Sequence, residues 1–333
     1  MFKFGKTAAV ILSAALCVGL FASCTPKEEM TKLRVSEVTH SIFYAPSYVA
    51  LNEGYFADEG LEIELLNGGG ADKVMTAVLS GSVDIGFSGP EAAIYVYNEG
   101  KEDYCEVFAQ VTKRDGSFLV GREPAEEFEW ENLRDSEVLP GRKGGVPYMT
   151  FLHVLKQKGF EPGADLIFND SIQFDLMAGA FSSGTGDYVT AFEPVASSLE
   201  AEGKGYIVAS VGEESGEIPY TAYYATKNYI KENSDIIERF TRAIKRGEEF
   251  VAEKSAQEIA KAIAPSFKET DLETLTKVVA RYKEIDAWCA EPFMKEEAFE
   301  KLQDVMTEAG ELQKRADYKK VVNNSFAEKV NQE

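Results

Sequence analysis

The sequence predicts an α/β protein built as two lobes, and three features lead to this prediction. From Leu33 onward, short apolar or alternating runs take turns with helical patterns, which is typical of parallel sheets covered by helices. Once a short N-terminal segment is set aside, roughly 310 of the 333 residues remain, more than one hydrophobic core usually serves. Two polar stretches, residues 112–116 and 212–219, interrupt the pattern and predict two crossings between the lobes.

The N-terminal segment has the features of an export signal. Two lysines precede an uncharged apolar run over residues 8–21, which is shorter than a membrane-spanning helix requires. The run leads into the sequence Phe-Ala-Ser-Cys, ending at Cys24, which resembles a bacterial lipobox. The resemblance implies a lipoprotein signal peptide over residues 1–23 and a diacylated Cys24, followed by a polar tether over residues 24–32. An uncleaved signal anchor is the alternative.

Composition narrows the classes of partner. The chain has 35 Lys and Arg against 56 Asp and Glu, a net charge of −21. Because an acidic surface repels phosphates, we expect neither nucleic acid nor anionic lipid headgroups as partners. No residues are spaced like a zinc site, and we expect neither metal nor cofactor. Cys105 and Cys289, which lie beyond the export signal, either pair or remain free thiols.

Residues 33–113 are expected to form the first part of the first lobe. Strict alternation of apolar and polar residues over 61–65 predicts a strand, which is followed by a glycine-rich break and an amphipathic helix ending at Gly81. A buried strand, a short turn and a helix that starts at Pro90 repeat this unit. The strands expected in this segment are residues 61–65, 84–87 and 104–111.

The second lobe is expected over residues 114–219, and residues 220–333 then return to the first. The return begins with a strand over residues 220–226 and continues as helices, whose apolar face includes Phe240 and Ile244, flanked by Ile236 and Phe250. The elements expected in the second lobe are a helix over residues 150–158 and strands over residues 187–190 and 206–211.

Candidate binding residues gather at three loops that precede helix starts. Ligands of open α/β sheets bind at the carboxyl ends of strands, where small residues admit a ligand and free amides can donate to it. Aromatic side chains near these loops favour a planar heterocycle, although any one of them alone is more often part of the core. The candidates are Phe43, Tyr44, Asn67, Ser88, Gly89, Glu91, Asp115, Gly145, Tyr148, Tyr188, Phe192, Glu193 and Tyr220.

Other chemistries have weaker support. The glycine loop over residues 67–73 lacks the spacing of a phosphate-binding loop. An anionic ligand would need Arg114, Arg122 or Arg142 to turn inward. An enzyme would need Glu91 and Glu193 as general acid and base, since no nucleophile–histidine arrangement is evident.

Several motifs together carry a family resemblance from about residue 34 to residue 226. They are residues 43–46, 50–56 with 59–61, 80–86 with 89–91, 114–118 and 141–147. These segments resemble the sulfonate/nitrate/thiamine-pyrimidine binding proteins of ABC importers. The resemblance implies a type II periplasmic-binding-protein fold, with two Rossmann-like lobes joined by two crossings and a ligand in the cleft between them.

The resemblance also implies a function without catalysis or cofactor. The protein would be a monomer, held only by its lipid anchor at the outer face of the cell membrane, that passes a small solute to a permease and its ATPase. Residues 67–70 and 89–91 look closer to the pyrimidine branch, which favours a thiamine precursor as solute. At Tyr148 the chain departs from the carboxylate expected there. The alternatives are a sulfonate or nitrate binder, a ligand sensor and a pyrimidine-forming enzyme, although that enzyme's cysteine cluster is missing from the sequence.

Overall fold

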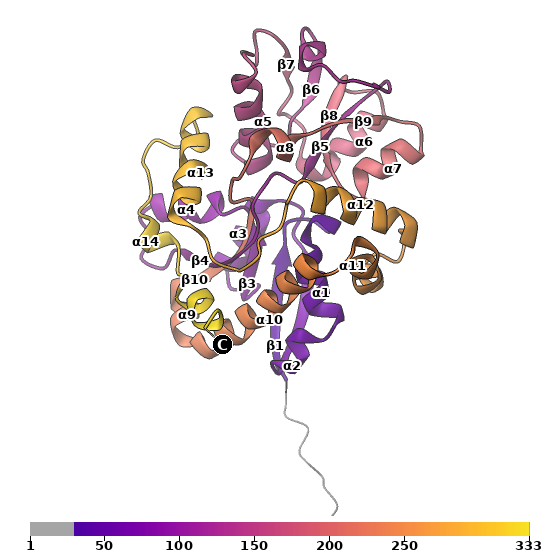
Figure 1. Cartoon of the computed structure of the whole chain (residues 1–333). Helices are drawn as coiled ribbons and strands as arrows, with labels where there is room; N and C mark the ends of the chain where they lie inside the picture. The colour runs from indigo at the N-terminus through magenta and orange to yellow at the C-terminus, as the bar shows by residue number, and fades with distance from the viewer. Residues whose placement is uncertain (1–29, 333) are drawn as a thin grey trace, which may run out of the picture. The chain divides into compact units, whose positions relative to one another are not determined.

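A computed structural model of the chain describes residues 30–332, and the residues from Thr31 onward form one compact unit (Figure 1). The predicted signal peptide, Cys24 and most of the predicted tether lie outside the described residues. Strand β1 (Thr31–Glu37) begins before Leu33, the expected start of structure. In the described part of the chain, no helix is both long and apolar enough to cross a membrane.

The first sheet has five strands in the order β2-β1-β3-β10-β4. β1 pairs in parallel with β2 and β3, whereas β10 runs antiparallel to β3 and β4. The sheet is therefore mixed, and the prediction of a parallel sheet is wrong, because β10 enters it from the second lobe in the opposite direction. The strands are β1 (Thr31–Glu37), β2 (Leu61–Asn67), β3 (Ile85–Ser88), β4 (Cys105–Thr112) and β10 (Thr221–Thr226).

The second sheet repeats this arrangement in the order β7-β6-β8-β5-β9. Its first strand in sequence, β5, runs antiparallel to both neighbours, while β6 pairs in parallel with β7 and β8. β5, β6 and β7 were not predicted, and the last two are only three and two residues long. The strands are β5 (Ser117–Gly121), β6 (Glu137–Leu139), β7 (Ile167–Phe168), β8 (Tyr188–Phe192) and β9 (Tyr206–Ser210).

The first-lobe helices follow the strands as the sequence patterns predict. α4 starts directly after Pro90, because proline already has a helical φ and needs no amide partner at a helix start. The helices of this segment are η1 (Ile42–Tyr44), α1 (Ala45–Asn52), α2 (Tyr55–Asp58), α3 (Ala71–Leu79) and α4 (Glu91–Asn98).

In the second lobe, α5 begins at Val146, earlier than the expected residue 150. Pro147 stands in its first turn, where it favours the helical conformation. The helices of this lobe are η2 (Trp130–Leu133), α5 (Val146–Gln157), η3 (Phe174–Leu176), α6 (Met177–Ser182), α7 (Val195–Ala201) and α8 (Val211–Ser215).

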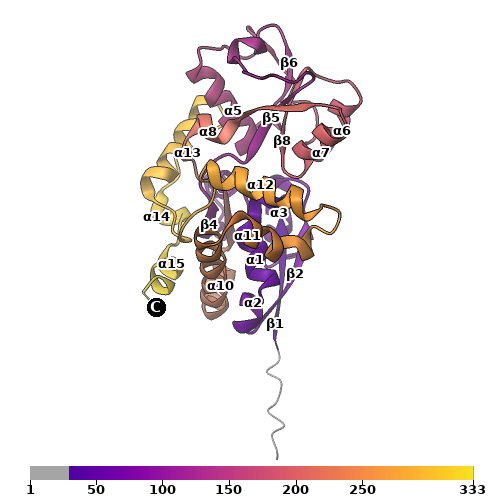
Figure 2. The ribbon, with the colours of Figure 1, turned by 45° about the vertical axis from the view of Figure 1, so that its right-hand side comes forward.

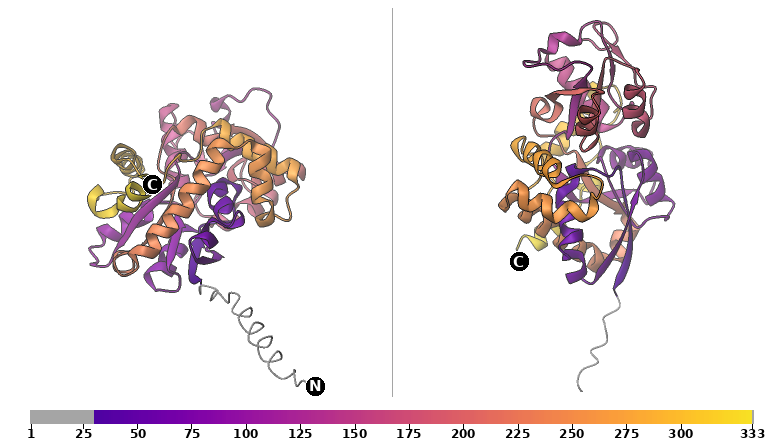
Figure 3. Two further views of the ribbon diagram at one scale, coloured as in Figure 1. Left: turned by 60° about the horizontal axis from the view of Figure 1, so that its bottom comes forward. Right: turned by 90° about the vertical axis from the view of Figure 1, so that its right-hand side faces the viewer.

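The C-terminal helices cover the first sheet and also reach the second lobe (Figure 2). The long helix α10 lies against β4 of the first sheet and against α1 (Figure 3). Its Phe240 and Ile244 are fully buried. Ile237 and Val251 complete its buried face, whereas the expected Ile236 and Phe250 are only partly buried. These helices are α9 (Lys227–Glu232), α10 (Ser234–Glu253), α11 (Ala256–Ile263), η4 (Ala264–Ser266), α12 (Leu272–Glu284), α13 (Glu296–Glu308), α14 (Tyr318–Val321) and α15 (Ser325–Val330).

Cys105 and Cys289 are buried free thiols. Cys105 on β4 lies 3.5 Å from the Met75 sulfur, and burial raises the pKa of its thiol to about 12. Cys289 is also buried, and burial raises the pKa of its thiol well above the usual value. The structure therefore favours free thiols over a disulfide between Cys105 and Cys289. Because burial raises the pKa of both thiols, they stay protonated and unreactive at neutral pH.

Candidate ligand cavity

One cavity lies where strand ends of the two lobes face each other. It follows the carboxyl ends of β1, β2 and β3 in the first lobe and of β6 and β8 in the second, as expected for a ligand site of open α/β sheets. Its empty space, open mouth included, is about 610 Å³. The first lobe and its return strand contribute Val38, Tyr44, Gly69, Gly70, Ala71, Asp72, Gly89, Glu91, Tyr220 and Thr221, and the second lobe contributes Arg142, Gly145, Val146, Pro147, Gln173, Phe174 and Phe192.

Three helices start at this cavity, namely α3, α4 and α5. The amides in the first turn of a helix have no partner within the helix, so these starts offer hydrogen-bond donors. None of the three has a side-chain cap at its N-cap position. Gly89, ahead of α4, leaves room for the Glu91 carboxylate, because a Cβ there would lie 1.9 Å from it.

Glu91 is the buried acidic group of the cavity. Its residue is 2% exposed, and its Oε1 accepts a hydrogen bond from the Val146 amide at 3.4 Å. Its Oε2 is also buried and has no hydrogen-bond partner. Burial raises the pKa of Glu91 to about 7, although nearby backbone amides and the charge of Arg142 oppose the shift. Glu91 therefore brings to the cavity wall a buried oxygen that lacks a hydrogen-bond donor.

A second polar position lies at Tyr220, whose buried hydroxyl interacts with the Asp115 side chain. Asp115 lies behind it, outside the cavity lining, with Oδ1 bonded to the amide and hydroxyl of Ser117 at 2.7 and 2.6 Å. Burial raises the pKa of Asp115 to about 7, and burial, with the Asp115 charge, raises the pKa of Tyr220 well above its usual value.

Aromatic rings form much of the cavity wall. Phe192 lies 5.9 Å from Phe174 and 6.1 Å from Tyr220, measured between ring centroids, and Tyr44 also lines the cavity. Phe43 is fully buried behind this wall, 5.7 Å from both Phe192 and Tyr220, and does not line the cavity. The rings therefore surround the space on both lobes, an arrangement suited to a flat molecule.

Charged side chains at the cavity mouth pair across the lobes. Arg142 lies 3.7 Å from Asp72, and beside this pair Lys73 lies 3.5 Å from Asp175. Arg142 is the one cavity-lining cation in the described residues. Arg122 instead donates to backbone carbonyls of the second lobe and stacks on a phenylalanine ring, and Arg114 does not line the cavity either.

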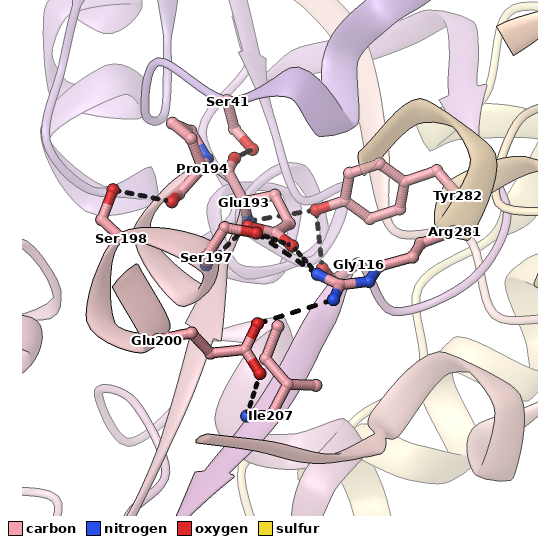
Figure 4. A network of polar contacts seen from close by, with 10 residues as sticks. All are labelled: Ser41, Gly116, Glu193, Pro194, Ser197, Ser198, Glu200, Ile207, Arg281 and Tyr282. Carbon is pink, nitrogen blue, oxygen red and sulfur yellow. Dashed lines mark hydrogen bonds and ion pairs between the residues drawn. The ribbon is translucent and has the colours of Figure 1, made fainter. Parts of the chain in front are cut away.

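Glu193 lies outside the cavity and holds the lobes together. Its residue is fully buried, and its Oε1 accepts a hydrogen bond from Arg281 Nη1 at 2.6 Å, while the Ser197 amide donates to Oε2 at 2.9 Å (Figure 4). Its backbone carbonyl accepts a hydrogen bond from Ser41 of the first lobe at 2.6 Å. The expectation that Glu193 faces a ligand is therefore not met, because Arg281 and Ser197 already use both carboxylate oxygens.

Four further expected residues also turn away from the cavity, because each has a local partner. Tyr148 packs on Phe168 at 5.0 Å, and Tyr188 lines a separate surface hollow of the second lobe. The Asn67 side chain accepts a hydrogen bond from its own loop, and the Ser88 hydroxyl lies 2.7 Å from that of Tyr224. The expected residues that do meet at the cavity are Tyr44, Gly89, Glu91, Gly145, Phe192 and Tyr220.

Several residues of the lining were not predicted from the sequence. Gly69, Gly70, Ala71 and Asp72 belong to the glycine-rich loop that was weighed as a phosphate site and likened to the pyrimidine branch, but only its Asn67 was predicted to contact a ligand. Gln173 and Phe174 have no recognisable motif, since a short segment between β7 and α6 brings them to the cavity. Among the described residues, no group of three or more His, Cys, Asp or Glu is placed to hold a metal ion.

Comparison with known proteins gives a consistent family. The family model described as NMT1/THI5 like matches residues 42–258. YtlA of Bacillus subtilis (strain 168), named as a candidate binding protein, is 43% identical over 323 residues, covering 95% of this chain and 97% of YtlA.

Two solved structures have the same fold. The zinc-bound ligand-binding component of an ABC-type import system from Staphylococcus aureus has a TM-score of 0.74 at 14% identity, covering 91% of this chain and 100% of that one. The alkanesulfonate-binding protein SsuA from Xanthomonas axonopodis pv. citri, bound to MOPS, has a TM-score of 0.70 at 15% identity, covering 89% and 99%. The predicted periplasmic-binding-protein fold is confirmed.

Proposed function

The chain belongs to the NMT1/THI5-like family, and from this premise we propose that it is the extracytoplasmic solute-binding protein of an ABC importer. YtlA is named as a binding protein, and the Staphylococcus structure is a ligand-binding component of such an importer. In this proposal Cys24 carries the lipid anchor, residues 114–219 form one lobe and the rest of the mature chain the other. The protein is a monomer that delivers its solute to a permease and ATPase.

We further propose that the solute is a small aromatic molecule, a pyrimidine thiamine precursor. The observation that carries this proposal is the pairing of aromatic walls with a buried acceptor: rings from both lobes face the space, and the Oε2 of Glu91 lacks a partner. A flat ring fills such a space by stacking, and a ring amino group can donate to a carboxylate oxygen. An unsatisfied buried acceptor costs free energy until a ligand supplies the donor.

A sulfonate or nitrate is the second candidate, because Arg142 and three helix starts reach the cavity. Two features disfavour it. The Arg142 guanidinium already lies near Asp72, and Glu91 places a carboxylate among the donors that would serve an anion. The charged lining consists of Asp72, Glu91 and Arg142, so its acidic groups outnumber its basic one.

Catalysis by a Glu91–Glu193 pair has little support. Glu193 is bonded to Arg281 and lies outside the lining, so Glu91 has no acidic partner there for acid–base chemistry other than Asp72 at the mouth. Among the described residues of the lining there is no cysteine, serine or histidine. These observations support a binding role.

Native mass spectrometry followed by calorimetry tests the proposal. Protein purified without harsh washing is examined for a bound molecule, and an aminopyrimidine is then titrated in competition with taurine, alkanesulfonates and nitrate. We expect an aminopyrimidine to bind and the anions to give no heat. Tight binding of a sulfonate, with no heat from any pyrimidine, would favour the second candidate instead.

A further inference from the structure

Glu91 lies where an anion would bind at the start of α5. This helix has twelve residues, and its N-cap, Gly145, has no side chain that could accept from the first-turn amides. The acceptor comes from the other lobe, because Glu91 on α4 receives the Val146 amide on its Oε1. A carboxylate of the first lobe therefore caps a helix of the second.

The surroundings of Glu91 fit this position. Gly89 leaves room for the carboxylate, since any Cβ there would collide with it. The residue is almost completely buried, yet its Oε2 has no partner, although a buried polar group usually has one. Arg142 does not satisfy it, because the ion pair of this arginine is with Asp72. A donor group of a solute in the cavity would satisfy this oxygen.

We propose that Glu91 determines which solutes this cavity accepts: it fills the anion position at the start of α5 and leaves one acceptor oxygen for an N–H or O–H donor. The inference rests on the proposed function and deepens it, by giving the class of solute. A sulfonate, nitrate or carboxylate cannot reach the Val146 amide without displacing the Glu91 side chain, which also repels these anions by like charge when it is ionised. A solute that donates to Oε2 also bonds to the group that joins the lobes, so its binding strengthens the closed arrangement.

The test exchanges the acceptor for a donor. Glu91→Gln keeps the size of the side chain and can still accept from Val146, but it turns an amide N–H₂ toward the cavity. The control is Glu311→Gln, which makes the same change next to the loop before α5, where Glu311 lies 3.7 Å from Lys143 and outside the cavity lining. A hydroxymethyl-aminopyrimidine and methanesulfonate are titrated into each protein by calorimetry.

We expect Glu91→Gln to weaken aminopyrimidine binding at least tenfold and to gain measurable methanesulfonate binding, while Glu311→Gln behaves as the parent. Glu91→Ala, which frees the α5 amides outright, should also gain methanesulfonate binding, so the test does not depend on one variant. Unchanged aminopyrimidine affinity with no sulfonate binding in either folded variant overturns the inference. If the parent binds no aminopyrimidine but both variants gain methanesulfonate, the proposed solute is wrong and the role of Glu91 stands.

Discussion

The Arg281 guanidinium of α12 donates a hydrogen bond of 2.6 Å to the Glu193 carboxylate of the second lobe (Figure 4). Glu193 directly follows Phe192, which forms part of the cavity wall. α12 packs on α11 and η1 of the first lobe, so the pair joins a first-lobe helix to the segment that positions this wall. The backbone of Glu193 is held from the same side, because Ser41 donates to its carbonyl and its amide donates to the Tyr282 hydroxyl.

We therefore expect Arg281→Ala to destabilise the protein strongly. Glu193 is fully buried, and removing one partner of a buried ion pair costs about 3 kcal/mol or more, because the other charge stays buried alone. The control is Arg315→Ala, whose exposed pairs with Glu300 and Asp304 should contribute about 0–1 kcal/mol. Urea unfolding measures both changes. Equal losses of unfolding free energy in the two variants would mean that the Glu193 pair is no more than a surface contact.

Phe174→Ala should weaken solute binding about tenfold, with little change in stability. The ring lines the cavity but is only partly buried in the protein, so its contact with a solute matters more than its packing in the core. Tyr188→Ala is the matched control, because it removes an aromatic ring of the same lobe that lies outside the cavity. Calorimetry on the identified solute gives the affinities. An equal loss of affinity in both variants would contradict the placement of the site.

Cys24→Ala should release the protein from the membrane. Only the thiol can accept a diacylglyceryl group, and two acyl chains are what hold a soluble domain stably at a membrane. Thr25→Ala, which changes the neighbouring residue and keeps the thiol, should remain attached. Fractionation with carbonate extraction compares the two. Cys24→Ala protein that stays in the extracted membrane pellet would support an uncleaved signal anchor.

Local sequence patterns predicted the strands and helices in which buried and exposed side chains follow a regular pattern over a few residues. The alternating segment from Leu61 is the edge strand β2, and the short apolar run ending at Phe87 is the central strand β3. A partly exposed edge strand alternates in the sequence and a fully buried strand is apolar throughout, so both can be recognised locally. β5 (Ser117–Gly121) was missed because it follows the polar crossing at once, and only its pairing with β8 and β9 makes it a strand.

The sequence predicted which loops meet at the candidate site, but it did not predict which side chains of those loops face the cavity. The loops that end at Gly89 and Gly145 meet because carboxyl ends of strands meet, which is a property of the fold. Whether Glu193 faces a ligand depends on Arg281, far along the chain, and the direction of Tyr148 depends on Phe168 in the same way. No local pattern contains these partners.

The stability of the ligand-free protein should fall as pH rises from about 4.5 to about 7. Burial raises the pKa of Glu91 to about 7, whereas a glutamate in the unfolded chain has a pKa near 4.3. Between these values the folded protein holds a proton that the unfolded chain has lost, so rising pH favours unfolding. Asp115, whose pKa burial also raises to about 7, acts in the same direction.

Glu91→Gln isolates this contribution, since glutamine does not titrate. Relative to the parent, the variant should gain on the order of 3 kcal/mol of unfolding free energy between pH 4.5 and pH 7.5, because the parent alone must ionise a buried carboxyl over that range. The charged and titratable groups that act on Glu91 are Arg142, from the second lobe, and the tyrosines Tyr44, Tyr95, Tyr220 and Tyr224, and all five are kept in the variant. Glu126→Gln, at an exposed position, is the control and should follow the parent at every pH. Urea unfolding at intervals across this range gives the curves. A constant difference between Glu91→Gln and the parent would mean that Glu91 is ionised throughout, with a donor on its Oε2 before any solute arrives.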